Sequence, residues 1–139
     1  MALVVAAVAG GILLLRAADT SRPVAVVGDT QPAQRFQSVG VDAFDRLRGG
    51  KDVVVLDVRT PKEYTRGKIP QAMNLDWYSP EFAAKAARLD RSKKYLVYCR
   101  SGHRSALACR KLQKLGFTNL VNLKGGIKAW MAHDKPIEP

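Results

Sequence analysis

Residues 95–117 read YLVYCRSGHRSALACRKLQKLGF. Four apolar or aromatic residues precede Cys99, and this composition favours a buried β-strand. A short turn containing Gly102 follows the cysteine. Beyond the turn, apolar residues recur at helical spacing until Gly116, where a helix can stop (Ala106, Leu107, Cys109, Leu112 and Leu115). The stretch therefore predicts a strand, a loop and a helix, with a cysteine at the point where the strand becomes the loop.

The alternation of short apolar runs with helix-length segments continues along residues 36–139. We expect strands at residues 36–39, 53–58, 72–75, 95–99 and 120–123, and helices at residues 41–50, 60–67, 79–89, 104–117 and 125–133. The second helix opens with Thr60 and Pro61 and carries Glu63 three residues after the threonine, which is the pattern of a capping box. The third helix opens with a similar Ser-Pro-Glu. This order predicts an α/β domain with a mostly parallel sheet and helices on both faces.

Residues 1–15 form an uncharged and almost wholly apolar run that ends at Arg16. We expect a hydrophobic N-terminal anchor or a signal-like segment here, with a buried hydrophobic helix as the third alternative. As a helix, residues 2–15 cover only about 21 Å, which is shorter than a hydrocarbon layer of roughly 30 Å. Cleavage is not favoured, because no basic residue precedes the run and the candidate cleavage site begins with Arg16.

Residues 16–35 mix Pro, Gly, Asp, Thr and Ser without a sustained period, and we expect a linker that leads to the domain of residues 36–139. Arg16 and Arg22 lie downstream of the apolar run. This charge bias favours a membrane-associated protein with its domain on the cytosolic side, and an exported or periplasmic domain is the alternative.

The chain carries 23 Lys and Arg against 12 Asp and Glu, which gives a net charge of +11. Such a charge suits nucleic acid, anionic lipid or small anionic substrates. The basic residues are spread along the whole chain, without zinc-finger spacing or a repeated Arg-rich block, so we do not expect nucleic acid as a partner. No Cys or His cluster has the spacing of a metal site, and two cysteines make no disulfide framework. Cys109 and Trp130 are interpreted as packing residues.

Cys99 lies where open α/β sheets place their chemistry, beyond the carboxyl end of a strand and before the N-terminus of a helix. A helix N-terminus favours the thiolate, which is the reactive form of cysteine. The loop after Cys99 can curl so that its backbone N–H groups surround the sulfur, and Gly102 allows the tight curl. Three cationic or titratable side chains stand in the loop (Arg100, His103 and Arg104). The alternative is an exposed basic turn after a buried cysteine.

Three stretches resemble the signature stretches of the rhodanese-like domain: LDVRTPKEYTRGKIPQAMNL (56–75), VYCRSGHRSALA (97–108) and GFTNLVNLKGGIKAW (116–130). The resemblance covers roughly residues 36–135 and points to single-domain sulfurtransferases rather than tandem-domain enzymes. It implies a five-stranded parallel sheet flanked by helices. It also implies an activity. A cysteine takes a sulfane sulfur from a small anionic donor such as thiosulfate, holds it as a persulfide without a further cofactor, and passes it to cyanide or to a thiol, including the thiol of a protein.

By this resemblance, Cys99 is the catalytic nucleophile. The backbone that follows it is the cradle of the persulfide (Arg100, Ser101, Gly102, His103, Arg104 and Ser105). Arg100 and Arg104 are expected to orient the anionic donor and the departing sulfite. His103 is interpreted as a solvent-facing residue at the rim, with a proton carrier as the alternative.

The same resemblance assigns supporting roles to Asp57, Arg59 and Glu63. We expect hydrogen bonds and ion pairs that run from Asp57 and Arg59 to the loop or to Glu63, and direct contact of Arg59 with the substrate is the alternative. The family usually has GHIPGA where this chain has GKIPQA. Lys68 and Gln71 therefore depart from the pattern, and we expect them to change only surface and turn detail.

Two rival functions remain at this stage. A phosphatase or an arsenate reductase is the first, because phosphatases of this fold also use a loop cysteine and a closing arginine. Four residues separate Cys99 from Arg104, whereas those phosphatases have five, and the shorter ring suits one sulfur atom better than a phosphoryl group. The second rival is a non-catalytic rhodanese-like binding module or a persulfide carrier. The presence of Cys99 argues against an inactive module and leaves the carrier open.

Overall fold

The computed structural model describes residues 36–139. The expected anchor or signal-like segment (residues 1–15) and the expected linker (residues 16–35) lie outside the described residues. Within residues 36–139, no helix combines the length and the apolar composition needed to cross a membrane.

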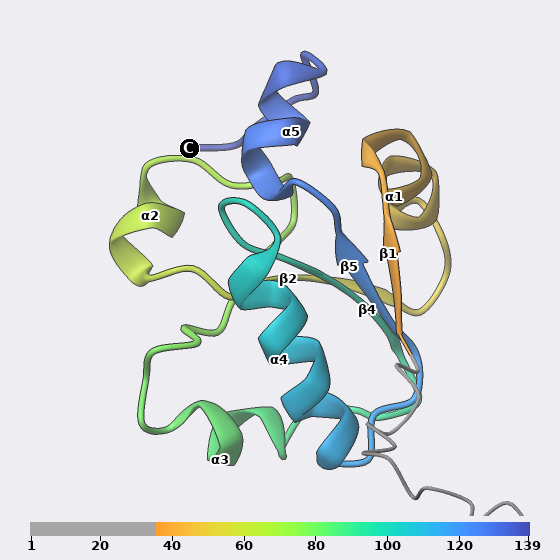
Figure 1. Cartoon of the computed structure of the whole chain (residues 1–139), viewed down its shortest axis with the longest axis vertical. Coiled ribbons are helices and arrows are strands. Elements are labelled where there is room, and N and C mark those ends of the chain that lie inside the picture. Colours follow the sequence, from red (N-terminus) through yellow and green to blue (C-terminus); the bar gives the residue numbers. More distant parts are fainter. Residues whose placement is uncertain (1–35) are drawn as a thin grey trace, which may run out of the picture. The chain divides into compact units, whose positions relative to one another are not determined.

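A five-stranded parallel sheet forms the centre of the domain, in the order β1-β5-β4-β2-β3. Its strands are β1 (Gln37–Val39), β2 (Val53–Asp57), β3 (Met73–Asn74), β4 (Lys94–Tyr98) and β5 (Leu120–Leu123). The helices are α1 (Val41–Arg48), α2 (Pro61–Thr65), α3 (Phe82–Ala86), α4 (His103–Lys114) and α5 (Gly126–Ala132) (Figure 1). Each strand and helix that the sequence predicts between residues 36 and 139 is present, so the predicted α/β fold is confirmed.

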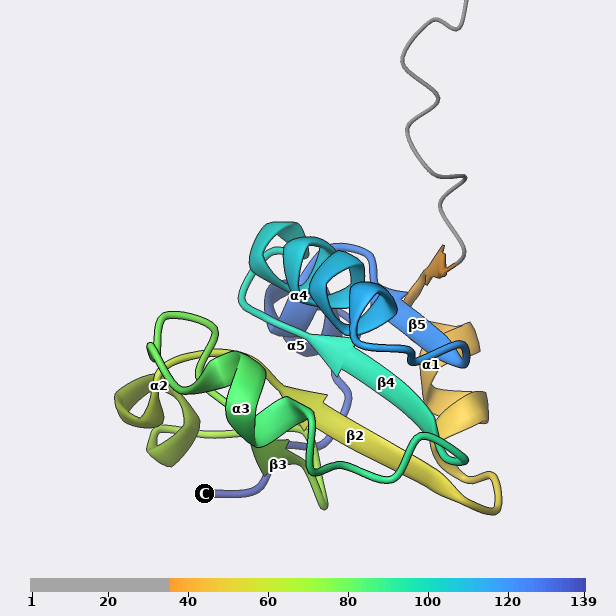
Figure 2. The same cartoon turned by 90° about the horizontal axis from the view of Figure 1, so that it is seen from below.

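Helices pack on both faces of this sheet (Figures 1 and 2). On one face, α3 and α4 bury apolar side chains such as Cys109 and Leu112 against the strands. On the other face, α1 and α5 do the same with Phe44 and Trp130, whose rings meet edge to face at 6.2 Å. Cys109 and Trp130 are both 0% exposed, which confirms their interpretation as packing residues.

Local sequence explains most of the helix boundaries. Thr60 Oγ1 accepts a hydrogen bond from Glu63 N, and the Glu63 carboxylate accepts one from Thr60 N, so the predicted capping box opens α2. The Ser-Pro-Glu opening does not cap α3 in the same way. Ser79 Oγ accepts a hydrogen bond from Glu81 N and forms a turn, and the helix begins only at Phe82. Ser side chains stabilise turns as readily as helix N-termini, which explains why α3 begins three residues later than predicted.

The carboxyl ends of β2 and β4 lie side by side, because Asp57 pairs with Tyr98 in the parallel register. Cys99 comes directly after Tyr98, and Arg59 lies two residues after Asp57. The sheet therefore brings the predicted nucleophile and two of its predicted supporting residues to the same edge.

Candidate active site

The Cys99 sulfur lies inside the loop that joins β4 to α4. Its Sγ accepts a hydrogen bond of 3.1 Å from Gly102 N and one of 3.3 Å from Ser105 Oγ, and the residue is only 1% exposed. Gly102 has a φ of 99°, a left-handed conformation that glycine adopts without strain. A Cβ atom at this position would also lie 3.2 Å from Gly125 N. A side chain at this position would therefore strain the backbone and crowd the turn before α5.

The surroundings of Cys99 favour its thiolate. Burial alone would raise the pKa of this thiol, but the Ser105 hydroxyl and the amides of Ser105, Ser101 and Gly102 lower the pKa by more, so the net direction is downward. Cys109 shows the opposite case, since burial raises the pKa of its thiol to about 12. Of the two cysteines, only Cys99 is placed to act as a nucleophile.

Arg104 and Glu63 form a two-point ion pair that ties the first turn of α4, directly after the loop, to α2. Both terminal nitrogens of the guanidinium donate to the carboxylate at 2.8 Å, and the guanidinium lies over the Tyr78 ring at 5.4 Å. The Arg104 hydrogen bonds, with those from Thr60, lower the pKa of Glu63 to about 2. Arg104 thus positions the loop, and its part in orienting an anionic donor stays a prediction.

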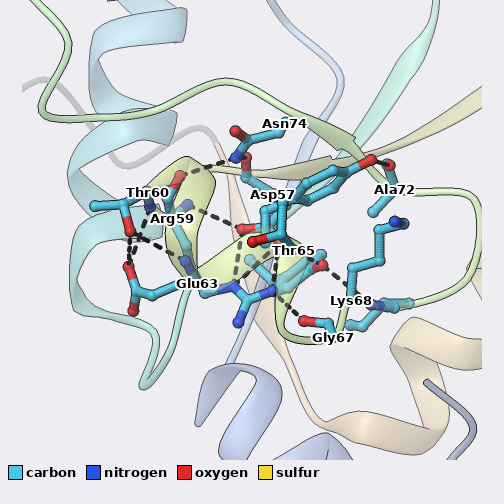
Figure 3. A network of polar contacts seen from close by, with 12 residues as sticks. Asp57, Arg59, Thr60, Glu63, Thr65, Gly67, Lys68, Ala72 and Asn74 are labelled. Carbon is cyan, nitrogen blue, oxygen red and sulfur yellow. Dashed lines mark hydrogen bonds and ion pairs between the residues drawn. The ribbon is translucent and has the colours of Figure 1, made fainter. Parts of the chain in front are cut away.

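Asp57 and Arg59 pair with each other in the interior (Figure 3). Arg59 Nε donates to both Asp57 oxygens at 3.0 Å, and Nη2 donates to Asp57 Oδ2 and to Gly67 O, each at 2.6 Å. The expected network was to run from this pair to the loop or to Glu63. Among residues 36–139, no side-chain hydrogen bond or ion pair joins Asp57 or Arg59 to either, and Glu63 binds Arg104. The pair instead reaches Tyr98, whose hydroxyl donates to Asp57 Oδ2 at 2.7 Å.

Sequence reasoning missed Tyr98 and Asn74. The Tyr98 hydroxyl also accepts a hydrogen bond of 3.1 Å from Ile69 N, so it connects β4, β2 and the 67–71 turn. The signal was a tyrosine in a buried strand, since a buried hydroxyl needs partners. The Asn74 amide donates to the carbonyls of Asp57 and Arg59 and holds the turn after β2 (Figure 3).

The other residues of the expected persulfide cradle lie in the loop (Arg100 and Ser101) or in the first turn of α4 (His103 and Ser105). Arg100, Ser101 and His103 are exposed, and Ser105 is fully buried. The exposure of His103 agrees with a position at the rim. Within residues 36–139, no group of three or more His, Cys, Asp or Glu side chains is placed to hold a metal ion.

The first turn of α5 also holds the loop between β4 and α4. Ile127 N donates to Cys99 O at 2.9 Å, and Lys128 N donates to Arg100 O at 3.1 Å. This close approach requires Gly126, because a Cβ atom there would overlap the backbone of Arg100. Backbone hydrogen bonds from α5 therefore fix the first two residues of the loop.

The turn that holds the two departures from the family pattern binds the C-terminal tail. Lys68 forms an isolated antiparallel bridge with Glu138, and its Nζ donates to Pro139 O at 2.9 Å. Gln71 N donates to Glu138 Oε2 at 3.3 Å, and Gln71 has a φ of 66°. The Lys68 side chain thus does more than alter the surface of a turn, since it binds a segment distant in sequence. The contact of Gln71 is made by its backbone N–H and does not depend on its side chain.

Comparisons with known proteins agree with this geometry. Residues 40–133 match the rhodanese-like domain family. A sulfurtransferase of Allochromatium vinosum is 38% identical over 92 residues, which cover 66% of this chain and 84% of the relative, and a putative sulfurtransferase of Bacillus subtilis, YtwF, is 35% identical over 66% and 86%. The crystal structure of a rhodanese-related protein from Thermoplasma volcanium superposes with a TM-score of 0.66 at 35% identity, over 73% of this chain and 97% of that one. With the thiol at the end of β4 and the loop curled around it, these matches show that the chain belongs to the rhodanese-like domain family, whose relatives here include sulfurtransferases.

Proposed function

We propose that the protein is a sulfurtransferase that moves a sulfane sulfur from thiosulfate or a similar donor to a thiol or cyanide through a persulfide on Cys99. The observation that carries this proposal is the Cys99 sulfur itself, which sits in a ring of donors (Gly102 N and Ser105 Oγ) that lower its pKa. A buried anion with such donors is an activated nucleophile.

In the first half-reaction, the Cys99 thiolate attacks the outer sulfur of thiosulfate. A new S–S bond forms on Cys99, the S–S bond of the donor breaks, and sulfite leaves with the electron pair. The donors that stabilise the thiolate also stabilise negative charge on the terminal sulfur of the persulfide. Arg100 is an exposed residue of the loop, and its charge attracts the anionic donor.

In the second half-reaction, a thiolate or cyanide attacks the outer sulfur of the persulfide. The bond between the two sulfurs breaks, and Cys99 leaves as a thiolate, so no external cofactor is needed. The same first step also serves a persulfide carrier that hands its sulfur to another protein. The two functions differ only in the acceptor.

Two features weigh against phosphoryl transfer. Only four residues separate Cys99 from Arg104, and the Arg104 guanidinium uses both terminal nitrogens on Glu63. A phosphatase needs such an arginine to bind the phosphoryl oxygens. The loop is therefore better suited to a persulfide than to a phosphoryl group.

Intact mass spectrometry after incubation with thiosulfate tests the proposal. We expect a gain of about 32 Da, one sulfur, in the wild-type protein and in Cys109→Ala, and no gain in Cys99→Ala. Thiocyanate should then form when cyanide is added. A mass gain without turnover by cyanide or small thiols would favour the carrier, and no mass gain after reduction would favour the binding module. Hydrolysis of an aryl phosphate without turnover of thiosulfate would reject sulfur transfer.

We also propose that residues 1–15 associate the protein with a membrane, because this segment is uncharged and almost wholly apolar. Cell fractionation of the full chain, compared with a chain lacking residues 2–15, tests this. Equal recovery of both chains in the soluble fraction would reject the anchor.

A further inference from the structure

The fold gathers basic side chains at the end of the domain opposite the catalytic loop. The strands of a parallel sheet all begin at one edge and end at the other, and Cys99 lies at the edge where they end. α4 spans the distance from the catalytic loop to the opposite end (Figure 1). Three segments meet at that opposite end, which we call the basal end: those before β2 and β4, and the last turn of α4 with the residues before β5 (51–52, 87–94 and 111–119).

Contacts join the three segments into one surface. Lys94 N donates to Asp52 O at 3.0 Å, which connects the starts of β4 and β2. Arg91 Nε donates to Leu115 O at 2.8 Å, and the Arg91 guanidinium lies over the Phe117 ring at 4.9 Å. The segment before β4 therefore contacts both of the other two.

The basal end carries a surplus of positive charge. Its segments contain seven cationic side chains and two carboxylates (Lys51, Arg88, Arg91, Lys93, Lys94, Lys111 and Lys114 against Asp52 and Asp90). None of the seven cations forms an ion pair with another residue in the range 36–139. These residues are far apart in the sequence, so the surplus arises only when the chain folds.

Structural roles explain only part of this charge. Arg91 holds the end of α4 through Leu115 O, and Lys111 and Lys114 lie in the last turn of that helix, where cations interact favourably with the helix dipole. The other four cations lie outside the helices that the structure describes (Lys51, Arg88, Lys93 and Lys94). The proposed catalytic steps use none of the seven. A cluster of unpaired cations of this kind attracts an anionic partner.

The kinds of side chain at the basal end favour a layer of lipid headgroups as this partner. Residues 36–139 expose four large apolar side chains, and none of them lies at the basal end (Met73, Tyr78, Met131 and Ile137). The basal end therefore offers no exposed aromatic ring on which the bases of a single-stranded nucleic acid could stack. It also offers no large apolar side chain for insertion into hydrocarbon, so contact would be made at the level of the headgroups.

The chain enters the domain at the same end. β1 begins at Gln37 and runs parallel to β5, so its first residue lies at the edge where the strands begin. An apolar segment at residues 1–15 that is held in a membrane would therefore tether the domain from its basal end. This connection gives the basal cations access to the membrane surface.

We propose that the basal end binds the surface of an anionic membrane, which leaves the catalytic loop facing away from the bilayer. The inference goes beyond sulfur transfer and extends the proposed membrane association of residues 1–15. That segment is short for a membrane span, and a basic surface supplies a second attachment, so the two together bind more firmly than either alone. The sulfur donor and the acceptor would then reach Cys99 from the solvent.

Cosedimentation with lipid vesicles tests the proposal. The full chain is compared with a chain lacking residues 2–15, because residues 31–139 form a compact unit separate from residues 1–30. The vesicles contain phosphatidylcholine alone or with about one third phosphatidylserine. We expect the shortened chain to bind only the vesicles with phosphatidylserine, and to dissociate when NaCl is raised from about 0.1 M to about 0.5 M.

The two membrane proposals are judged separately in this experiment. Binding of the full chain to phosphatidylcholine alone reports on residues 1–15. Binding of the shortened chain reports on the basal end, and the proposal is overturned if that chain binds neither kind of vesicle or binds both equally.

Charge variants of the shortened chain assign the binding to the basal end. Lys51→Gln, Arg88→Gln and Lys114→Gln together remove three exposed cations, one from each segment. We expect this triple variant to bind anionic vesicles about a hundredfold more weakly, because each cation near an anionic surface contributes roughly fivefold. Its persulfide formation with thiosulfate should be unchanged, which shows that it is folded.

The matched control removes the same charge from the catalytic end. Lys62→Gln, Lys124→Gln and Lys128→Gln change exposed lysines that follow the carboxyl ends of β2 and β5, and this variant should bind vesicles like the parent chain. Equal weakening in both triple variants would overturn the proposal, since net charge alone would then explain binding. So would tighter binding to an RNA oligonucleotide than to anionic vesicles at the same ionic strength, which would make the basal end a nucleic-acid surface.

Discussion

The hydroxyl of Tyr98 donates a hydrogen bond of 2.7 Å to Asp57 Oδ2 and so joins the last residues of β4 and β2. Asp57 is fully buried and pairs with Arg59. Since Cys99 directly follows Tyr98, the position of the nucleophile depends on this buried polar network. Such networks stabilise one arrangement only when every member has its partners.

Tyr98→Phe keeps the ring and removes the hydroxyl, which leaves Ile69 N without its acceptor. We expect a loss of about 1–3 kcal/mol in the free energy of unfolding and a lower kcat with little change in KM for thiosulfate. Urea unfolding and steady-state kinetics check both. Tyr78→Phe is the control, because Tyr78 is 66% exposed. The network would have no structural role if Tyr98→Phe were as stable as the control.

Ser105→Ala removes the hydroxyl that contributes most to lowering the pKa of Cys99. The pKa of the thiol should rise, so less thiolate is present at neutral pH and the pH profile of persulfide formation should move to higher pH. At pH 7 we expect a rate lower by about tenfold, since a hydrogen bond to a charged group contributes roughly 1.5–3 kcal/mol. Ser101→Ala is the control, because Ser101 contributes only its backbone amide. Equal shifts in the two variants would contradict this assignment.

Glu63→Gln tests the pair that ties the first turn of α4 to α2. Pairing with Arg104 lowers the pKa of Glu63 from 4.5 to about 2 in the folded protein. A lowered folded-state pKa stabilises the protein above the unfolded pKa, and this stabilisation is lost as the pH falls from about 4.5 towards 2. We expect the wild-type protein to lose about 1–2 kcal/mol over this range, allowing for solvent screening, and Glu63→Gln to lose less.

Thermal unfolding between pH 6 and pH 2.5 measures this difference. Glu81→Gln provides the comparison, because its pair with Lys85 is exposed and contributes little. The proposed role of Glu63 would be wrong if the wild-type protein and Glu63→Gln lost stability in parallel.

The alternation of short apolar runs with helix-length segments was sufficient to predict the strands, the helices and the edge of the sheet at which Cys99 lies. The loop geometry was also accessible, because a strand end, a glycine and a helix start are local features of residues 95–117. Likewise, Thr60 and Glu63 are close enough in sequence for their capping box to be recognised. Most features that depend on neighbouring residues were therefore predicted, although the Ser-Pro-Glu opening at residues 79–81 forms a turn and not a helix start.

The choice of partners among distant charges was not predictable in the same way. The expected network from Asp57 and Arg59 to Glu63 does not form, because the tertiary fold brings Arg104, 41 residues away in sequence, to Glu63. The anchoring of the tail at Lys68 has the same origin, since its partners Glu138 and Pro139 lie at the end of the chain. Such pairings depend on how distant segments pack together, and no local pattern in a single sequence indicates that packing.

Gly126→Ala should disrupt the contact between α5 and the catalytic loop. Gly126 has a φ of 60°, and a Cβ atom there would overlap the backbone of Arg100 and the carbonyl of Cys99. We expect a loss of several kcal/mol in stability together with a loss of persulfide formation, because neither backbone can move aside freely. Gly40→Ala is the control, since a Cβ atom at Gly40 meets nothing within 4 Å. Normal activity in Gly126→Ala would show that α5 does not constrain the loop.

Gln71→Gly should stabilise the protein. Gln71 has a φ of 66°, a conformation that costs a residue with a side chain roughly 1–2 kcal/mol and costs glycine nothing. The gain is reduced by the greater freedom of glycine in the unfolded chain, so we expect a net increase of up to about 1 kcal/mol in the free energy of unfolding. The backbone N–H that binds Glu138 is kept. Gln71→Ala separates the two contributions, because it removes the side chain and retains the strain. Urea unfolding should therefore place Gln71→Gly above the wild-type protein and Gln71→Ala at or below it, and equal stabilities of the two variants would show that the backbone of Gln71 is not strained.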